Sequence, residues 1–179
     1  MSNRIVVDPR VVSTFAHQNL NPGTIVVVPE GVKEIPAKFF FNNPNIYEVH
    51  LPHSLETIGT MAFGSTGLKW VTIPQSVKKI GSAAFSECKF LEHVLLPNSL
   101  KEIGYSAFLE CRKLKSLFVP DSVTRIGDFA FANCKSLKCV RMPKQFERFG
   151  VCVFKNTSLR FKHKVSVFFA KINRIGGND

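Results

Sequence analysis

The side chains in this sequence that could do chemistry are cysteines and histidines, five of each. Cys88, Cys111 and Cys134 recur at intervals of 23 residues, which places one thiol at the same position of three successive structural units. We interpret them as a column of small buried thiols. A disulfide between neighbouring units is also conceivable, because a strand spacing of about 4.7–4.9 Å lies within the Cα separations that disulfides tolerate. No Cys-x-x-Cys or His-x-x-x-His pair accompanies them, so the sequence predicts no zinc site.

The histidines form no catalytic pattern; they are His17, His50, His53, His93 and His163. We expect His50 and His93 to point outward from strands two units apart, about 10 Å from each other, which is too far to share one metal ion. The sequence also lacks the Gly-x-Ser-x-Gly elbow, the glycine-rich phosphate loop and the His-Glu-x-x-His helix. It therefore predicts a non-catalytic protein without a metal or a cofactor.

The elements that position these side chains follow from an internal repeat. Six prolines stand 22 or 23 residues apart: Pro29, Pro52, Pro74, Pro97, Pro120 and Pro143. A phenylalanine follows each proline by eleven residues: Phe40, Phe63, Phe85, Phe108, Phe131 and Phe154. Most units end in a pattern close to Leu-x-x-Val-x-Leu-Pro, whose period of two is typical of a strand with one buried face. A fixed period in the twenties predicts a solenoid, because stacked units bury columns that one unit cannot bury alone.

One complete unit, at residues 91–114, reads Leu-Glu-His-Val-Leu-Leu-Pro-Asn-Ser-Leu-Lys-Glu-Ile-Gly-Tyr-Ser-Ala-Phe-Leu-Glu-Cys-Arg-Lys-Leu. This unit resembles the BspA-type leucine-rich repeat, and the resemblance covers about residues 24–160. It implies a leucine-rich-repeat fold and a role as an adhesion or interaction module rather than as an enzyme. Proteins similar to it occur on microbial and protozoan surfaces and among the products of large DNA viruses.

We therefore expect an α/β repeat fold, a leucine-rich-repeat solenoid of about six 23-residue units. A parallel β-sheet is predicted on one face and short helical turns, at the Ala-Phe steps, on the other. Residues 1–20 are predicted to form an N-terminal cap, residues 21–160 the repeats, and residues 161–179 a basic C-terminal cap and tail. No stretch is apolar enough for a membrane-spanning helix, and residues 1–9 lack a secretion signal. The sequence thus predicts a protein of the cytoplasm or of a viral particle.

The solvent side of the predicted sheet is where binding is expected. Trp70, Leu95 and Phe118 fall at outward positions on consecutive strands, where a stable monomer usually has polar side chains. Such an apolar patch indicates a protein interface. The predicted partner-binding residues are Glu48, His50, Trp70, Thr72, His93, Leu95, Phe118 and Arg141. The alternative is that the C-terminal segment of the chain itself folds over the patch.

Positive charge is concentrated at the C-terminal end of the chain. The formal net charge is +11, and residues 135–179 hold eleven lysines and arginines against two acidic residues. This asymmetry indicates an acidic partner at that end. The predicted anion-binding residues are Lys144, Arg160, Lys162, His163 and Lys164. The alternative is that these side chains only keep the end of the solenoid soluble and unpaired.

Together these observations predict a non-catalytic scaffold that binds an acidic or apolar partner protein through the outward face of the sheet. A first alternative is a minor structural component of a large assembly such as a virion, or a homo-oligomer. A second alternative is binding of nucleic acid or an anionic surface through the basic end. That alternative is less favoured, because aromatic side chains are not interleaved with the basic ones as a stacking groove requires.

Overall fold

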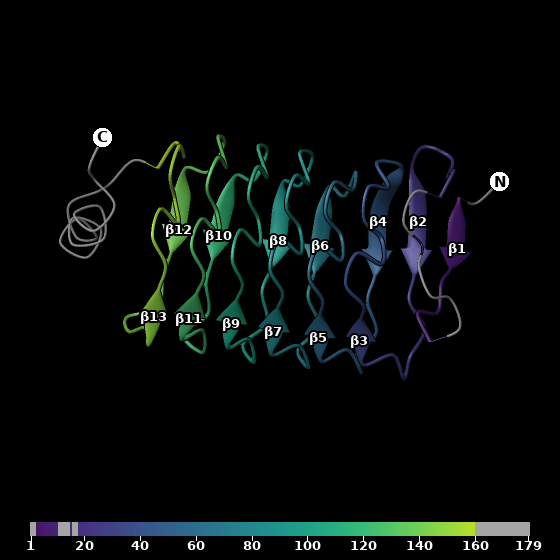
Figure 1. The fold of residues 1–179 in the computed structure, drawn as a ribbon, viewed down its shortest axis with the longest axis horizontal. Coiled ribbons are helices and arrows are strands. Elements are labelled where there is room, and N and C mark those ends of the chain that lie inside the picture. Colours follow the sequence, from purple (N-terminus) through teal and green to yellow (C-terminus); the bar gives the residue numbers. More distant parts are fainter. Residues whose placement is uncertain (1–2, 11–14, 16–17, 160–179) are drawn as a thin grey trace.

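The computed structural model describes residues 3–10, 15 and 18–159, which form an elongated parallel β-solenoid (Figure 1). Two rows of short strands run along the molecule, and each full turn of the chain contributes one strand to each row. We call these rows the first and the second ladder. The predicted C-terminal cap and tail at residues 161–179 lies outside the described residues.

The first ladder contains, in the described part of the chain, β1 (Arg4–Val6), β2 (Thr24–Val27), β4 (Ile46–His50), β6 (Trp70–Thr72), β8 (His93–Leu95), β10 (Ser116–Phe118) and β12 (Cys139–Arg141). Its hydrogen-bonded strand pairs are all parallel and form three groups, β1-β2-β4, β6-β8 and β10-β12. Like positions of successive units lie opposite each other in β6-β8 and β10-β12, as where Val71 lies opposite Val94. The predicted parallel sheet is therefore confirmed. β1 adds a strand ahead of the first repeat, because residues 4–6 pair with residues 25–27.

The second ladder is a six-stranded parallel sheet formed by β3 (Glu34–Ile35), β5 (Thr57–Ile58), β7 (Lys79–Ile80), β9 (Glu102–Ile103), β11 (Arg125–Ile126) and β13 (Arg148–Phe149). From β3 to β11, the isoleucine of each strand is buried and the preceding residue faces solvent at least in part. The sequence analysis did not predict this ladder, because two-residue strands are too short to show an alternating pattern.

The prediction of short helical turns at the Ala-Phe steps is wrong, since the described residues contain no helix. Each turn segment instead holds two non-glycine residues with φ between 50 and 62°, four positions apart. These residues are Lys38, Asn42, Met61, Ser65, Ala83, Glu87, Ser106, Glu110, Phe129, Asn133, Cys152 and Asn156. A left-handed residue at every fourth position excludes an α-helix, which needs consecutive right-handed residues.

Hydrogen bonds between turns explain why this conformation replaces a helix. After β5, the amides of Met61 and Phe63 donate to carbonyls of the following turn, at Ser82 and Ala84 (2.9 and 2.8 Å). The amide between them, that of Ala62, donates to a carbonyl within its own turn. In a helix each of these amides would bond to the fourth preceding carbonyl. Stacking of the turns therefore engages the amides that a helix needs.

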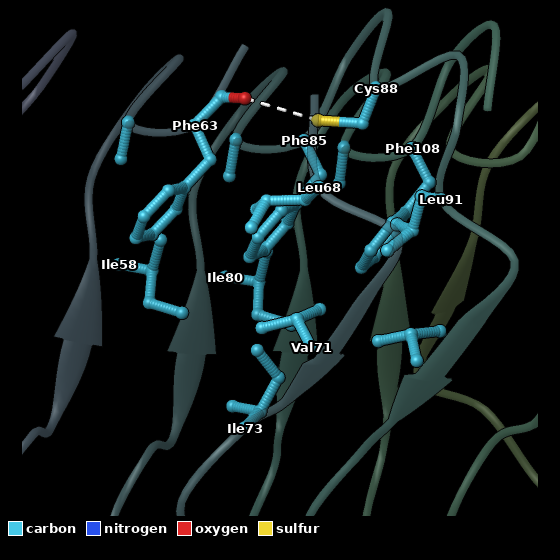
Figure 2. Packing of buried hydrophobic residues seen from close by; sticks show 14 of the residues in the cluster. Ile58, Phe63, Leu68, Val71, Ile73, Ile80, Phe85, Cys88, Leu91 and Phe108 are labelled. Carbon is cyan, nitrogen blue, oxygen red and sulfur yellow. Dashed lines mark hydrogen bonds between the residues drawn. The ribbon is translucent and has the colours of Figure 1, made fainter. Parts of the chain in front are cut away.

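The repeated phenylalanines form one stacked row through the core, part of which is shown in Figure 2. From Phe40 to Phe154, the centroids of successive rings lie 5.1–5.6 Å apart at interplanar angles of 5–16°. Phe15 extends the row at its N-terminal end, with a centroid 5.7 Å from that of Phe40. Side chains of both ladders pack around the row, among them Val71 from the first ladder and Ile80 from the second.

The separation between turns requires glycine at two kinds of position. A Cβ atom on Gly104 would lie 2.7 Å from the carbonyl carbon of Gly81 and from the amide nitrogen of Ser82. The second unit is one residue shorter than the others, and a Cβ atom on its Gly67 would overlap the carbonyl oxygen of Pro44. Backbone atoms fill both spaces, so an added methyl group would force the turns apart.

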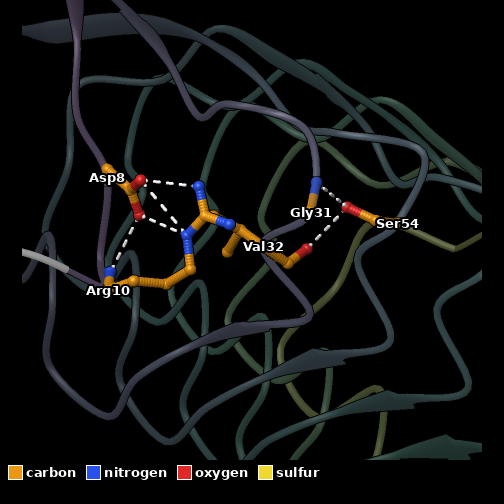
Figure 3. Close-up of polar contacts among 5 residues, drawn as sticks. All are labelled: Asp8, Arg10, Gly31, Val32 and Ser54. Carbon is orange, nitrogen blue, oxygen red and sulfur yellow. Dashed lines mark hydrogen bonds and ion pairs between the residues drawn. The ribbon is translucent and has the colours of Figure 1, made fainter.

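A row of serines two residues after the prolines links successive turns. Ser54 shows the arrangement: its hydroxyl donates to the Val32 carbonyl at 2.8 Å and accepts from the Gly31 amide at 2.9 Å (Figure 3). Serines of later units donate to the preceding turn in the same way; they are Ser76, Ser99 and Ser122.

At the N-terminal end, Asp8 and Arg10 form an ion pair of 2.7 Å.

The variant Phe85→Ala is expected to lower the free energy of unfolding by about 3–5 kcal/mol, the usual effect of truncating a buried phenylalanine. The ring is fully buried between its neighbours in the stacked row. Phe90→Ala is the matched control, because Phe90 is 49% exposed and its loss is expected to change stability by less than about 1 kcal/mol. Urea unfolding followed by circular dichroism measures both variants. Equal losses would contradict a core organised around the row.

Candidate protein-interaction face

Strand alternation turns one set of side chains of the first ladder into the core and the other set toward solvent. The central residues of β6, β8 and β10 are buried, whereas Trp70, Leu95 and Phe118 are 40, 64 and 46% exposed. Three large apolar side chains on consecutive strands thus lie on the surface. We call the outward side chains of β4 to β12 the sheet face; they are Glu48, His50, Trp70, Thr72, His93, Leu95, Ser116, Phe118, Cys139 and Arg141.

The register of the strands arranges the sheet face in two columns. Trp70 lies opposite His93 in one column, and Thr72 lies opposite Leu95 in the other. β10 and β12 pair in an equivalent register, with Ser116 opposite Cys139 and Phe118 opposite Arg141. All eight predicted partner-binding residues therefore lie on the outward side of the first ladder.

Trp70 packs against an aromatic neighbour that the sequence analysis did not identify. The ring of Tyr47 meets the indole edge-on, with centroids 5.1 Å apart and an interplanar angle of 86°. Tyr47 stands at a bulge in β4. Thr24 pairs with Ile46 and Ile25 pairs with Glu48, so Tyr47 between them has no partner in β2. A bulge re-aims the side chain of the unpaired residue. Simple alternation along the sequence assigns Tyr47 to the buried side, and so it misses this contact.

Between β4 and β6 the sheet face is hollowed into a groove of about 380 Å³. Glu48 and His50 line it from β4, and Trp70 and Thr72 line it from β6. Nε2 of His50 lies 2.7 Å from Oε1 of Glu48. The groove thus combines an aromatic surface with hydrogen-bonding groups, a combination suited to holding a side chain of a partner protein.

At the other end of the sheet face, a cation lies over an aromatic ring. The guanidinium carbon of Arg141 is 4.7 Å from the centroid of Phe118, the residue opposite it in the register. This cation–π contact holds both side chains in place and leaves each of them exposed. The surface therefore presents an apolar ring and a positive charge side by side.

Of the predicted anion-binding residues, the structure describes only Lys144, which is exposed and follows β12. The others, Arg160, Lys162, His163 and Lys164, lie outside the described residues. Anion binding at the C-terminal end of the chain therefore stays a prediction.

The cysteine column lies in the core, behind the turn segments. Cys88, Cys111 and Cys134 are buried free thiols, and each donates to the phenylalanine carbonyl of the preceding turn at 3.1–3.2 Å, as Figure 2 shows for Cys88. Burial raises the pKa of Cys88 to about 11, raises that of Cys134 to about 12, and raises that of Cys111 well above its ordinary value. Thr66 stands in the same column, with its hydroxyl oxygen 3.2 Å from the sulfur of Cys88. These thiols are structural groups.

Within the described residues, no three His, Cys, Asp or Glu side chains gather closely enough to hold a metal ion. No helix of that part of the chain has the length and the apolar character needed to cross a membrane.

The stacked turns, the parallel ladders and the continuous apolar core define a leucine-rich repeat solenoid. Six copies of the BspA type leucine-rich repeat region match residues 33–160, more than half of the chain, and the chain therefore belongs to this family. Leucine-rich repeat proteins generally serve as protein-interaction scaffolds and are generally not catalytic. No curated protein matches the chain.

Similar solved structures are those of bacterial leucine-rich repeat proteins. The leucine-rich repeat protein of T. pallidum is 27% identical, with a TM-score of 0.72 over 98% of this chain and 91% of its own. The pneumococcal vaccine antigen PcpA is 27% identical, with a TM-score of 0.62 over 69% of this chain and 31% of its own. A leucine-rich repeat protein from Bacteroides ovatus, 24% identical, shares the fold with a TM-score of 0.62 over 87% of this chain and 50% of its own. The chain thus spans half or less of the latter two proteins.

The raised pKa values of the buried thiols predict a loss of stability at alkaline pH. Thiols of the unfolded chain ionise near pH 9.0, whereas Cys88 and Cys134 in the folded protein keep their protons up to about pH 11 and 12. The unfolded state therefore loses protons first, and the free energy of unfolding falls as pH rises above 9.0. Urea titrations below pH 9.0 and between pH 9.0 and about 11 measure the fall. Serine at all three positions should remove most of it; an unchanged fall in that variant would refute the assignment.

The single tryptophan provides a test of whether the sheet face is open in the full chain. Because Trp70 is 40% exposed, acrylamide is expected to quench its fluorescence in the native protein, with a quenching constant within a few-fold of the unfolded value. The competing prediction, in which the C-terminal segment covers the patch, requires a blue-shifted emission and a protected indole. The two results exclude each other.

Proposed function

We propose that this chain is a protein-interaction scaffold whose sheet face binds a partner protein. The observation that carries the proposal is the exposure of Trp70, Leu95 and Phe118 on three consecutive strands. Tryptophan and arginine are the residues that most often dominate the energetics of protein interfaces, and aromatic residues are enriched there. The sheet face offers both, with Arg141 next to Phe118.

The rigidity of this surface supports the proposal. Hydrogen-bonded strands fix its backbone, and the outward aromatic rings are held by neighbours, Trp70 by Tyr47 and Phe118 by Arg141. A surface that is already ordered loses little conformational entropy on binding, so more of the contact energy remains as affinity. This preorganisation favours binding of a partner over a merely structural role for the exposed rings.

The state of the cysteines supports a non-catalytic role. A nucleophilic cysteine needs a lowered pKa and access to a substrate. The three thiols of the column are buried, and their pKa values are raised by that burial. They therefore lack both properties.

The double variant Trp70→Ala with Phe118→Ala is expected to lower partner affinity about thirtyfold or more, because truncating a single interface anchor already removes about 2 kcal/mol. Affinity capture from a native lysate of the source cells, quantified by mass spectrometry against the wild-type chain, measures the change. A partner retained at the wild-type level by the double variant would contradict the proposal.

The matched control is Phe90→Ala. Phe90 is exposed to a similar degree as Phe118 and also lies under a cation, with Nζ of Lys113 5.1 Å from its ring centroid. It belongs to the turn segment before β8 and not to the sheet face. Binding that is lost equally in the control would show that general surface apolarity, rather than this face, captures the partner. Circular dichroism of all variants checks that the fold is kept.

A further inference from the structure

Most acidic side chains of the solenoid are already engaged by basic ones. Seven of them form ion pairs with lysine or arginine: Asp8, Glu56, Glu87, Glu92, Glu102, Glu110 and Glu147. Glu30 and Glu48 lie against the rings of His53 and His50. Many of these pairs join adjacent turns, as where Glu102 receives Lys79 from one side and Arg125 from the other, both at 3.2 Å. The carboxylates of the molecule are therefore largely matched, whereas the 24 lysines and arginines outnumber the 13 acidic residues and leave an excess of positive charge.

A column of charged residues beside the sheet face contains one of these ion pairs. Lys69, Glu92, Lys115 and Lys138 follow one another in this column, each amide donating to the carbonyl of the preceding turn. The carboxylate of Glu92 pairs with the ammonium of Lys115. The next turn supplies Lys138, which is the last member of this column in the described residues.

The charged residues of the last strand of the first ladder and its flanks are all basic. Lys138 directly precedes β12, Arg141 ends it and Lys144 follows it. All three are exposed, and none of them is ion-paired within the part of the chain that the structure describes. The sequence beyond residue 159 contains a single acidic residue, Asp179. Three positive charges thus lie on or beside β12 without an ion-paired carboxylate among the described residues.

The unmatched charges adjoin the apolar part of the sheet face. Arg141 contacts the ring of Phe118, and Leu95 is the next outward residue of the same column. From β6 to β12 the sheet face spans three strand spacings, about 14 Å. An extended peptide covers that distance with about four to five residues. The opposite end, at β4, carries Glu48 and His50 in contact with each other and offers no lysine or arginine on the sheet face.

We propose that the sheet face binds an extended acidic segment of a partner protein. Its carboxylates pair with Lys138, Arg141 and Lys144, and its apolar side chains pack on Phe118, Leu95 and Trp70. This inference rests on the proposed function and specifies the chemistry of the partner. The positive end steers the segment to the face, which makes association faster at low ionic strength, and the apolar anchors slow its dissociation.

The probe is a fluorescein-labelled peptide of about eight residues in which glutamate alternates with leucine or phenylalanine, long enough to cover the face. Fluorescence anisotropy measures its affinity for the full chain at low and at physiological ionic strength. Arg141→Glu is expected to weaken binding about tenfold or more, because it both removes and reverses a charge at the contact. Lys101→Glu makes the same change of net charge at an exposed residue beside β9, and it is expected to change affinity less than about twofold.

Three further probes decide whether binding needs both the acidic side chains and the apolar side chains of the peptide. A peptide with lysine in place of glutamate should bind much more weakly. A polyglutamate of the same length should lack the contribution of the anchors, and its affinity should be unaffected by Trp70→Ala with Phe118→Ala. A single-stranded oligonucleotide should bind no more tightly than polyglutamate. Equal binding of the lysine peptide, equal binding of polyglutamate, or tighter binding of the oligonucleotide would each overturn the inference, as would an Arg141→Glu variant with wild-type affinity.

Failure of this inference is separable from failure of the proposed function. Suppose that the double variant at Trp70 and Phe118 no longer binds the native partner and that the wild-type chain does not bind the acidic peptide. In that case the sheet face binds a partner of different chemistry. If the double variant keeps its native partner, the sheet face is not the interface, and the acidic segment has no site there.

Discussion

The separation between successive turns, fixed by backbone hydrogen bonds, is the constraint on which the rest of this structure depends. Parallel strands stack at about 4.7–4.9 Å, and the phenylalanine rings behind them follow at 5.1–5.6 Å. At that distance the inward columns repeat a narrow choice of side chains, such as phenylalanine from Phe40 to Phe154. The glycine column marks where backbone meets backbone, and the phenylalanine column marks where a flat ring fills the space between turns.

The same constraint leaves the outward positions free to vary. An inward side chain touches its equivalents in the turns before and after it, so its identity is repeated along the column. An outward side chain of the first ladder meets solvent, and its identity can therefore serve binding. This is why Trp70, Leu95 and Phe118, which belong to no repeated column, carry more information about function than the phenylalanine row, although that row holds the fold together.

The sequence was sufficient to predict the repeat, the parallel register of the first ladder and the outward columns, because each of these follows from period and alternation alone. It was insufficient where hydrogen bonds between turns decide the conformation. The Ala-Phe steps were expected to be helical, yet amides such as that of Phe63 bond to the next turn. Tyr47 packs on Trp70 beside an irregular register between β2 and β4. Bonds and irregularities that join distant turns leave no periodic signal in the chain.

In a stacked fold, charged side chains, like apolar ones, interact mainly with the equivalent side chains of the adjacent turns. A charge at one level meets the charges of the levels above and below, so a solenoid stays neutral along a column only if the signs alternate or balance. Glu102 between Lys79 and Arg125 satisfies this condition. At the β12 level Lys138 follows Lys115 as the last member of its column in the described residues. Repulsion within such a column is relieved by solvent, by salt or by an acidic partner. We propose a partner segment that is both acidic and apolar because such a segment matches these charges and the apolar side chains beside them.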